Sequence, residues 1–205
     1  MRQSAVEHAL QTFRRYGLDL DTVKCIDVGG TRHVYLETEH VRQLTPHEKL
    51  KNDILHVLGE KTRVSKEVIV TQNPLIEKIR DLRFLDRGFN ADAIETLSDI
   101  EADFLVEADV APLTNTFDLV LSFDTLEHVS DPFTFCNNLL RVAKPEGYIY
   151  LQTVFKWDYH PSPKDYFRFS PDGLRECFSR SGGEMLECDW HEEEISVFAF
   201  LKKPF

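Results

Sequence analysis

The chain has 205 residues, of which 42% are hydrophobic and 29% are charged, and its formal net charge at pH 7 is −11. This length and composition suit a single globular domain over residues 1–205 with a sizeable core. The acidic balance argues against a nucleic-acid partner, because contacts to phosphates need a basic face. No apolar run approaches the roughly 18 residues that a membrane span needs, so the sequence predicts no membrane partner either.

The cysteines point to a reducing environment. Four are scattered along the chain without a Cys-x-x-Cys pair, namely Cys25, Cys136, Cys177 and Cys188. Reduced thiols in a cytoplasmic protein are the simplest interpretation, and no zinc site is predicted from them. The first residues lead into a charged amphipathic helix rather than an apolar signal segment, which also favours a cytoplasmic location.

The first third of the chain predicts a helix and a strand, followed by a segment of mixed character. The helix is expected over 4–17, where the capping-box spacing and one apolar face agree. A short apolar strand follows at 23–28. Residues 31–80 are expected to be an insertion or a divergent segment, with a helix-like patch at 50–58 and a strand at 66–72.

The remainder alternates strands and helices. Strands are expected at 83–86, 104–106, 117–123, 148–154, 185–190 and 195–201, and helices at 91–97, 133–142 and 171–180. This alternation implies a parallel sheet with right-handed crossovers. The last two strands are joined by so short a turn that they must be antiparallel. The sequence therefore predicts an α/β fold with a mostly parallel sheet and a C-terminal antiparallel hairpin.

The most informative stretch is 117–141, which joins an apolar strand, a polar elbow and an amphipathic helix. The elbow contains Leu126-Glu127-His128, and Asp131-Pro132 opens the helix with an N-cap and a first-turn proline. A strand that delivers polar groups at its carboxyl end, followed by a helix, is how α/β sheets build binding crevices.

Together with Asp27-Val28-Gly29-Gly30 upstream, this stretch resembles the S-adenosylmethionine (SAM)-dependent methyltransferases of the Rossmann-like type, with a type 11-like domain. The resemblance covers 23–30 and about 84 to the C-terminus, and leaves 31–80 unexplained. It implies a seven-stranded sheet with helices on both faces, SAM as cofactor, and methyl transfer to an oxygen or nitrogen of a small molecule or glycan. A SAM-fold protein that binds its cofactor or a partner without turnover is the alternative.

A nucleotide-sugar or dinucleotide enzyme on a similar sheet is a further rival. It predicts a full Gly-x-Gly-x-x-Gly after the first strand, which residues 27–33 lack.

The resemblance assigns cofactor-binding residues to strand ends. Asp27, Gly29 and Gly30 would hold the methionine part of SAM, although the later glycine of the usual motif is replaced. The acid that binds the ribose hydroxyls would be Asp86, or Glu37 if residues 34–36 are the second strand of the sheet.

The same resemblance places the adenine and the methyl-transfer centre. Asp109 would accept from the adenine amino group, beside the amide of Val110. Phe123 and Asp124 would lie under the methyl-transfer centre. His128 either packs against the cofactor in a catalytic position or caps the following helix as a structural residue.

A proline-stiffened loop over 159–170 concentrates polar groups after the fifth strand. His160, Asp165 and Tyr166 are the catalytic candidates here, with His160 as the base for an oxygen acceptor because an unperturbed imidazole titrates near neutrality. The alternative is an ordered loop in which Asp165 and Arg168 form a local ion pair and Tyr166 and Phe169 belong to the core.

Neither a metal site nor an oligomeric state is predicted. His33, His40 and His47 recur every seven residues, which is not a ligand pattern, so surface histidines are the simpler interpretation. The aromatic-rich C-terminal hairpin is a candidate interface for a homodimer.

Overall fold

The structure is a computed structural model that describes residues 3–30, 33–38, 67–86, 98–161 and 164–205. The chain divides into two compact units. Met1–Arg32 and Asn73–Phe205 form the first unit, and His33–Gln72 form the second. The first unit contains the main sheet and the candidate site.

The main sheet of the first unit has seven strands in the order β5-β4-β1-β6-β7-β9-β8. The strands are β1 (Lys24–Val28), β4 (Asp81–Asp86), β5 (Ile100–Glu101), β6 (Phe117–Phe123), β7 (Ala143–Val154), β8 (Glu184–His191) and β9 (Ser196–Lys202). The first five in this list pair in parallel, whereas β9 runs antiparallel to both β7 and β8. The predicted fold class is confirmed.

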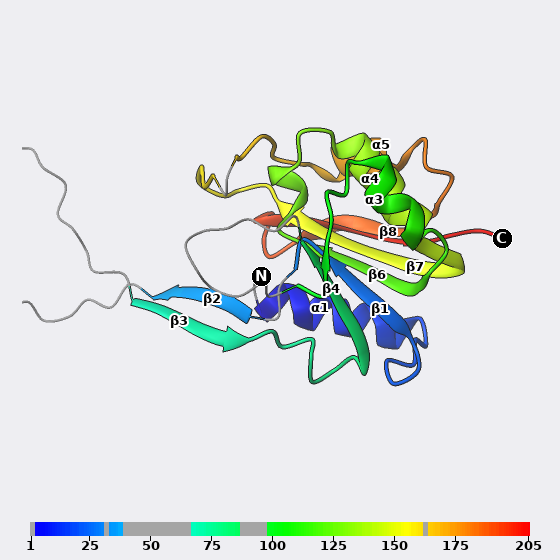
Figure 1. Cartoon of the computed structure of the whole chain (residues 1–205). Coiled ribbons are helices and arrows are strands. Elements are labelled where there is room, and N and C mark those ends of the chain that lie inside the picture. Colours follow the sequence, from blue (N-terminus) through cyan, green and yellow to red (C-terminus); the bar gives the residue numbers. More distant parts are fainter. Residues whose placement is uncertain (1–2, 31–32, 39–66, 87–97, 162–163) are drawn as a thin grey trace, which may run out of the picture. The chain divides into compact units, whose positions relative to one another are not determined.

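Helices cover both faces of this sheet (Figure 1). Helix α1 (Gln3–Arg15) lies on one face, and α3 (Glu107–Val110), α4 (Pro132–Val142) and α5 (Pro171–Phe178) lie on the other. The hydrophobic core accordingly forms two clusters. Phe13 of α1 packs against Tyr150, with ring centroids 5.6 Å apart, while Leu139 and Leu174 belong to the cluster of the opposite face.

The central strand β6 and the helix after it form as predicted. Six of the seven β6 residues are buried, because an interior parallel strand is covered on both faces. The elbow then makes one 3-10 turn over Leu126–His128. The side chain of Asp131 accepts a hydrogen bond from the Thr134 amide at 3.1 Å, and Pro132 occupies the first helical turn.

Polar side chains tie the strands together at both ends of the sheet. Asp118 accepts from the Lys24 amide at 2.9 Å and from Lys144 Nζ at 2.7 Å, so it links β1, β6 and β7. At the other end, the buried Ser122 hydroxyl donates to the Val28 carbonyl at 3.0 Å. These bonds fix where β1 ends relative to β6.

The C-terminal hairpin also forms as predicted, and its aromatic rings are used inside the fold. Phe198 and Phe200 are buried in the cluster beneath α1. They are therefore not part of an exposed aromatic surface, and a homodimer interface at this hairpin stays a prediction.

One strand prediction was wrong, and a second strand is longer than predicted. Residues 104–106 form a turn, because the Asp103 side chain accepts from the Leu105 amide at 3.0 Å and the chain then enters α3; the strand lies earlier, at Ile100–Glu101. Strand β7 begins at Ala143 rather than at 148, with an irregularity in its pairing with β6 and with a positive φ of 65° at Glu146. The predicted helices at 50–58 and 91–97 lie outside the described residues.

The second unit contains a two-stranded antiparallel sheet of β2 (His33–Thr38) and β3 (Glu67–Gln72). The strand predicted at 66–72 is confirmed. Residues 34–36 lie in this separate sheet, so Glu37 does not stand at the end of a main-sheet strand. That 31–80 is an insertion in one methyltransferase-like domain stays a prediction.

Two further findings concern the predicted environment of the chain. None of the helices in the described part of the chain combines the length and apolarity needed to cross a bilayer. The four cysteines are all buried and unpaired.

The N-cap of α4 supplies a stability test. Replacing Asp131 with alanine removes the acceptor for the Thr134 amide, and we expect the free energy of unfolding to fall by about 1 kcal/mol. Urea unfolding measures this change. Asp131→Asn is the matched control, because its side-chain oxygen still caps the helix; equal losses in both variants would contradict the capping role.

Candidate active site

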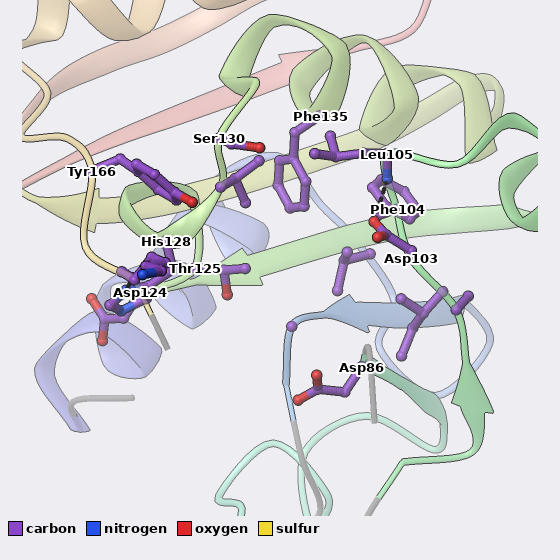
Figure 2. A pocket seen from close by; sticks show the side chains of 16 residues that line it. Asp86, Asp103, Phe104, Leu105, Asp124, Thr125, His128, Ser130, Phe135 and Tyr166 are labelled. Atoms are coloured by element: carbon purple, nitrogen blue, oxygen red, sulfur yellow. Dashed lines mark hydrogen bonds between the residues drawn. The ribbon is translucent and has the colours of Figure 1, made fainter. Parts of the chain in front are cut away.

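A pocket of about 320 Å³ opens at the carboxyl ends of β1, β4 and β6. Gly29, Asp86 and Asp124 line it, together with Asp103 from the loop after β5 (Figure 2). The strand order changes direction at β1, which has β4 on one side and β6 on the other. Open α/β sheets bind ligands at such a switch point, and the pocket lies there.

The turn after β1 requires both of its glycines. Gly29 has a φ of 83°, and a Cβ there would lie 2.3 Å from Thr125 Oγ1. A Cβ on Gly30 would lie 2.1 Å from Asp27 Oδ2. Any side chain at either position would therefore fill space that the elbow or Asp27 already occupies.

The Asp27 carboxyl group is completely buried beneath this turn. Among the described residues, neither of its oxygens has a hydrogen-bond partner. Burial, reinforced by the charges of Asp86 and Asp124, raises the pKa of Asp27 from 3.8 to about 7. A buried carboxyl group without a partner fits a ligand that brings a positive charge or a hydrogen-bond donor, as SAM does.

Asp86 stands at the end of β4, which pairs in parallel with β1. Its side chain belongs to the lining of the pocket, and Figure 2 shows it projecting from the end of the strand. This is where the resemblance requires the ribose acid. The role of Asp86 stays a prediction, and its rival Glu37 belongs to the other unit.

The predicted adenine residues do not line the pocket. Asp109 accepts from the Asp103 amide at 2.9 Å, so it holds the loop in place, and Val110 is fully buried in the core. Asp103 lines the pocket instead, with Phe104 and Leu105. Sequence reasoning missed Asp103 because it placed the strand at 104–106; the usable signal was an acid just after the short strand Ile100–Glu101.

Of the two residues predicted at the end of β6, Phe123 and Asp124, one lines the pocket. Phe123 is buried in the cluster beneath α1 and does not line the pocket, whereas Asp124 does. Asp124 has a φ of 45°, a left-handed conformation that Asp adopts more readily than most residues. Thr125 also lines the pocket, and its hydroxyl donates to the Phe123 carbonyl at 2.9 Å.

Beside the pocket, Glu127 lies between two histidines. Its Oε1 is 3.8 Å from Nε2 of His128 and 3.8 Å from Nε2 of His160. Its Oε2 accepts from the Thr153 hydroxyl at 2.7 Å. Glu127 is fully buried, and burial together with the Asp124 charge raises its pKa. His128 lines the pocket, so this cluster borders it.

Sequence reasoning singled out both histidines but not the acid between them. Glu127 was quoted only as part of the elbow. Its burial depends on the loop after β7, whose Tyr166 amide donates to the Glu127 carbonyl at 2.8 Å. The signal that could have found it is a carboxylate directly beside a pocket histidine.

The loop after β7 is organised by Asp165. The Arg168 guanidinium bonds both carboxylate oxygens, at 2.5 and 2.7 Å, and the His160 amide bonds Oδ2 at 2.8 Å. Arg168 first, and then the His160 amide, hold the pKa of Asp165 well below its usual range. This is the geometry of a local ion pair. Tyr166, by contrast, is 49% exposed and lines the pocket, while Phe169 is in the core.

The raised pKa of Asp27 predicts a pH dependence of stability. Between pH 3.8 and about 7 the folded chain keeps a proton that the unfolded chain has lost, so this group makes the free energy of unfolding fall as pH rises through that window. The effect is on the order of 4 kcal/mol. We expect Asp27→Asn to flatten the dependence in urea unfolding between pH 4 and pH 8.

The control for this experiment is Asp189→Asn, which neutralises an exposed acid on β8. It should leave the wild-type dependence in place. An Asp27→Asn variant with the same slope as the wild type would show that Asp27 is charged throughout.

Comparisons with known proteins agree with the fold. Residues 84–151 match the family model described as "Methyltransferase domain". A SAM-dependent methyltransferase from Aquifex aeolicus is 14% identical, with a TM-score of 0.53 over 98% of this chain and 93% of that one. No curated protein sequence matches the chain.

Two other solved structures are similar. One chain from the complex between the Haloferax volcanii Trm112 methyltransferase activator and a methyltransferase is 14% identical, with a TM-score of 0.56 over 98% of this chain and 90% of that one. The 1,6-didemethyltoxoflavin-N1-methyltransferase of Burkholderia thailandensis, with bound 1,6-didemethyltoxoflavin and S-adenosylhomocysteine, is 13% identical, with a TM-score of 0.53 over 99% and 79%.

The segment 84–151 carries β4 to β7 and thus most of the pocket lining. Identities this low establish the fold and not the acceptor. The chain has the Rossmann-like fold of the SAM-dependent methyltransferases, with a methyltransferase domain signature over residues 84–151.

Proposed function

We propose that the chain binds SAM in the pocket at the ends of β1, β4 and β6, and transfers its methyl group to a small molecule or glycan. The observation that carries the proposal is the buried, unpartnered Asp27 carboxyl group beneath the glycine turn, beside a pocket that three further acids line, Asp86, Asp103 and Asp124. A ligand with positive charge at one end and hydroxyl and amino donors along its length suits this set of acids.

The pocket residues suggest how SAM lies. Asp27 and the Gly29–Gly30 turn hold the methionine part, where the ammonium group supplies the partner that Asp27 lacks. Asp86 accepts hydrogen bonds from the ribose hydroxyls, and Asp103 from the adenine amino group. Four acids at one edge also favour the positively charged SAM over its neutral product after transfer.

The acceptor side of the site is formed by the loop after β7. Tyr166 and Lys164 line the pocket beside His128. Trp157 and Tyr159 are 49% and 74% exposed on the same loop. Exposed aromatic faces stack on flat rings and on the apolar faces of sugars, which supports a small-molecule or glycan acceptor.

The chemistry is an in-line displacement. The acceptor oxygen or nitrogen forms a bond to the methyl carbon, the carbon–sulfur bond breaks with its electron pair left on sulfur, and S-adenosylhomocysteine results. Because charge is lost at the sulfonium, the site mainly aligns and desolvates the reactants. A hydroxyl acceptor must also lose a proton, and in the metal-free protein His160 is the proposed base, with His128 beside it.

Asp165 and Tyr166 support this chemistry without taking the proton. The Asp165–Arg168 pair holds His160 through its amide, and Tyr166 contributes to the acceptor wall. The four unpaired cysteines support a cytoplasmic location.

A SAM-fold protein without turnover is the second candidate, favoured by the replacement of the later glycine in the turn. Calorimetric titration with SAM, followed by acceptor screening with sugars first, separates the two. Binding with methyl transfer supports the enzyme. Absence of binding to both SAM and its demethylated product would favour the alternative.

Variants of the ribose acid test the cofactor pose. We expect Asp86→Ala to weaken SAM binding about 10- to 100-fold in calorimetry, because it removes a charged hydrogen-bond acceptor. Glu37→Ala is the matched control, since it removes the rival acid in the other unit, and it should bind SAM as the wild type does. Weakening by Glu37→Ala alone would reverse the assignment.

A kinetic test concerns His160. We expect His160→Ala to lower kcat for a hydroxyl acceptor about 100-fold or more while the Kd of SAM stays nearly unchanged. The release of S-adenosylhomocysteine measures turnover, and calorimetry measures the Kd. Loss of turnover and SAM affinity together would mean that His160 only supports the loop.

A further inference from the structure

The cluster of Glu127, His128 and His160 has features that methyl transfer from SAM does not require. Oε1 of the glutamate and one ring nitrogen of each histidine all lie within 4.8 Å of one another. Glu127 and His128 come from the elbow after β6, whereas His160 comes from the loop after β7. The fold therefore brings together three groups that are typical metal ligands, although sequence reasoning predicted no metal site.

Both imidazole rings are held with Nε2 directed at Glu127. Nδ1 of His128 lies 2.6 Å from the Lys164 carbonyl oxygen, and Nδ1 of His160 lies 2.9 Å from the Asp158 carbonyl oxygen. A carbonyl oxygen only accepts, so in the neutral rings these contacts place the proton on Nδ1 and leave the lone pair on Nε2. Metal-binding histidines are oriented in this way, with the other ring nitrogen donating to a carbonyl or carboxylate.

The glutamate presents an oxygen that lacks a hydrogen-bond partner. Within the described part of the chain, Oε1 of Glu127 accepts no hydrogen bond, although the residue is fully buried. Its other oxygen is fixed by the Thr153 hydroxyl at 2.7 Å. The Asp124 charge adds to the negative potential at this position. A buried, oriented carboxylate oxygen between two imidazole lone pairs is an arrangement that a cation would complete.

The positive charge of Arg168, which acts on Glu127, is otherwise engaged. The Arg168 guanidinium is close enough for its charge to interact with Glu127, but it bonds both oxygens of Asp165. Its hydrogen bonds are thus directed away from Oε1.

We propose that Glu127, His128 and His160 bind a divalent transition-metal ion. Two imidazole nitrogens and one carboxylate oxygen suit zinc, iron or cobalt, and three protein ligands leave coordination positions open. Ligand atoms of a tetrahedral ion with bonds of roughly 2.0–2.2 Å are roughly 3.4 Å apart. The two separations of 3.8 Å between Glu127 Oε1 and the histidine Nε2 atoms need to shorten by a few tenths of an ångström, and the two imidazole rings, whose ligand nitrogens lie within 4.8 Å of each other, need to close on the ion as well.

Under the proposed function, the ion binds the acceptor. His128 lines the pocket, so an ion held by these three residues would lie at the edge of the proposed SAM site. A hydroxyl oxygen bound there loses its proton more easily, to a water molecule, and the resulting alkoxide attacks the methyl carbon as the carbon–sulfur bond breaks. With the ion bound, the Nε2 lone pair of His160 is a ligand, and the ion replaces His160 as the activating group. This role rests on the proposed function; the metal site does not.

Metal binding can be measured without an acceptor. The purified full-length chain is stripped with a chelator and titrated with Co²⁺, whose visible absorption reports ligand number and geometry, and then with Zn²⁺ in competition. We expect one Co²⁺ per wild-type chain. Glu127→Gln and His160→Ala should each weaken Co²⁺ binding at least about tenfold. In Glu127→Gln the side-chain amide oxygen can still accept the hydrogen bond from the Thr153 hydroxyl, so the substitution is conservative.

His191→Ala is the matched control, because His191 packs against His8 rather than against this cluster. The His191→Ala variant should bind Co²⁺ as the wild type does. Circular dichroism and thermal unfolding verify that each variant is folded. His160 lies on a loop, outside the helices and strands, so the His160→Ala variant still tests the proposal if Glu127→Gln does not fold. A wild type that binds no Co²⁺, or binding unaffected by the loss of either ligand, would overturn the proposal.

A parallel SAM titration of the stripped and the Co²⁺-loaded chain separates this inference from the proposed function. Co²⁺ binding without SAM binding supports the metal site and rejects the methyltransferase. SAM binding by a chain that binds no Co²⁺ rejects the metal site and leaves the cofactor assignment in place.

Discussion

The constraint on which the site depends is the gathering of carboxyl groups at one edge of the sheet. Parallel strands all end at this edge, and Asp27, Asp86 and Asp124 lie at the ends of three neighbouring strands, close enough for the charges of Asp86 and Asp124 to act on Asp27. Asp27 responds by holding its proton up to a pH of about 7. A ligand that brings positive charge to this edge would relieve the repulsion between these carboxyl groups.

The two ligands inferred here answer that constraint at different points. SAM brings its positive charge to the glycine turn, where the absence of a side chain on Gly30 leaves room for the Asp27 carboxyl group, and the metal ion brings charge to Glu127, which is fully buried beside the loop after β7. The elbow between β6 and α4 lies between these positions. Asp124, which acts on the pKa of both Asp27 and Glu127, couples them electrostatically.

Local patterns sufficed to predict much of the architecture. The β6 strand, the elbow and the α4 helix follow from an apolar run and the Asp131 cap, which act over a few residues. The turn at Asp103 was misread because a side-chain hydrogen bond to the Leu105 amide overrides the apolar pattern of 104–106. The role of Glu127 was invisible for a different reason: its neighbour His160 lies on another element, and sequence spacing does not reveal that contact.

The pairing of β1 has a consequence for how the chain folds. Lys24 of β1 pairs with Asp81 of β4, and its amide donates to Asp118 at the start of β6, so β1 finds its partners only in distant parts of the sequence. The β8–β9 hairpin, in contrast, closes over a few residues. Contacts of long sequence separation form slowly because the intervening chain must first be ordered. We therefore expect the hairpin to form early in folding. The pocket edge of the sheet is expected to form late, when β1 docks between β4 and β6.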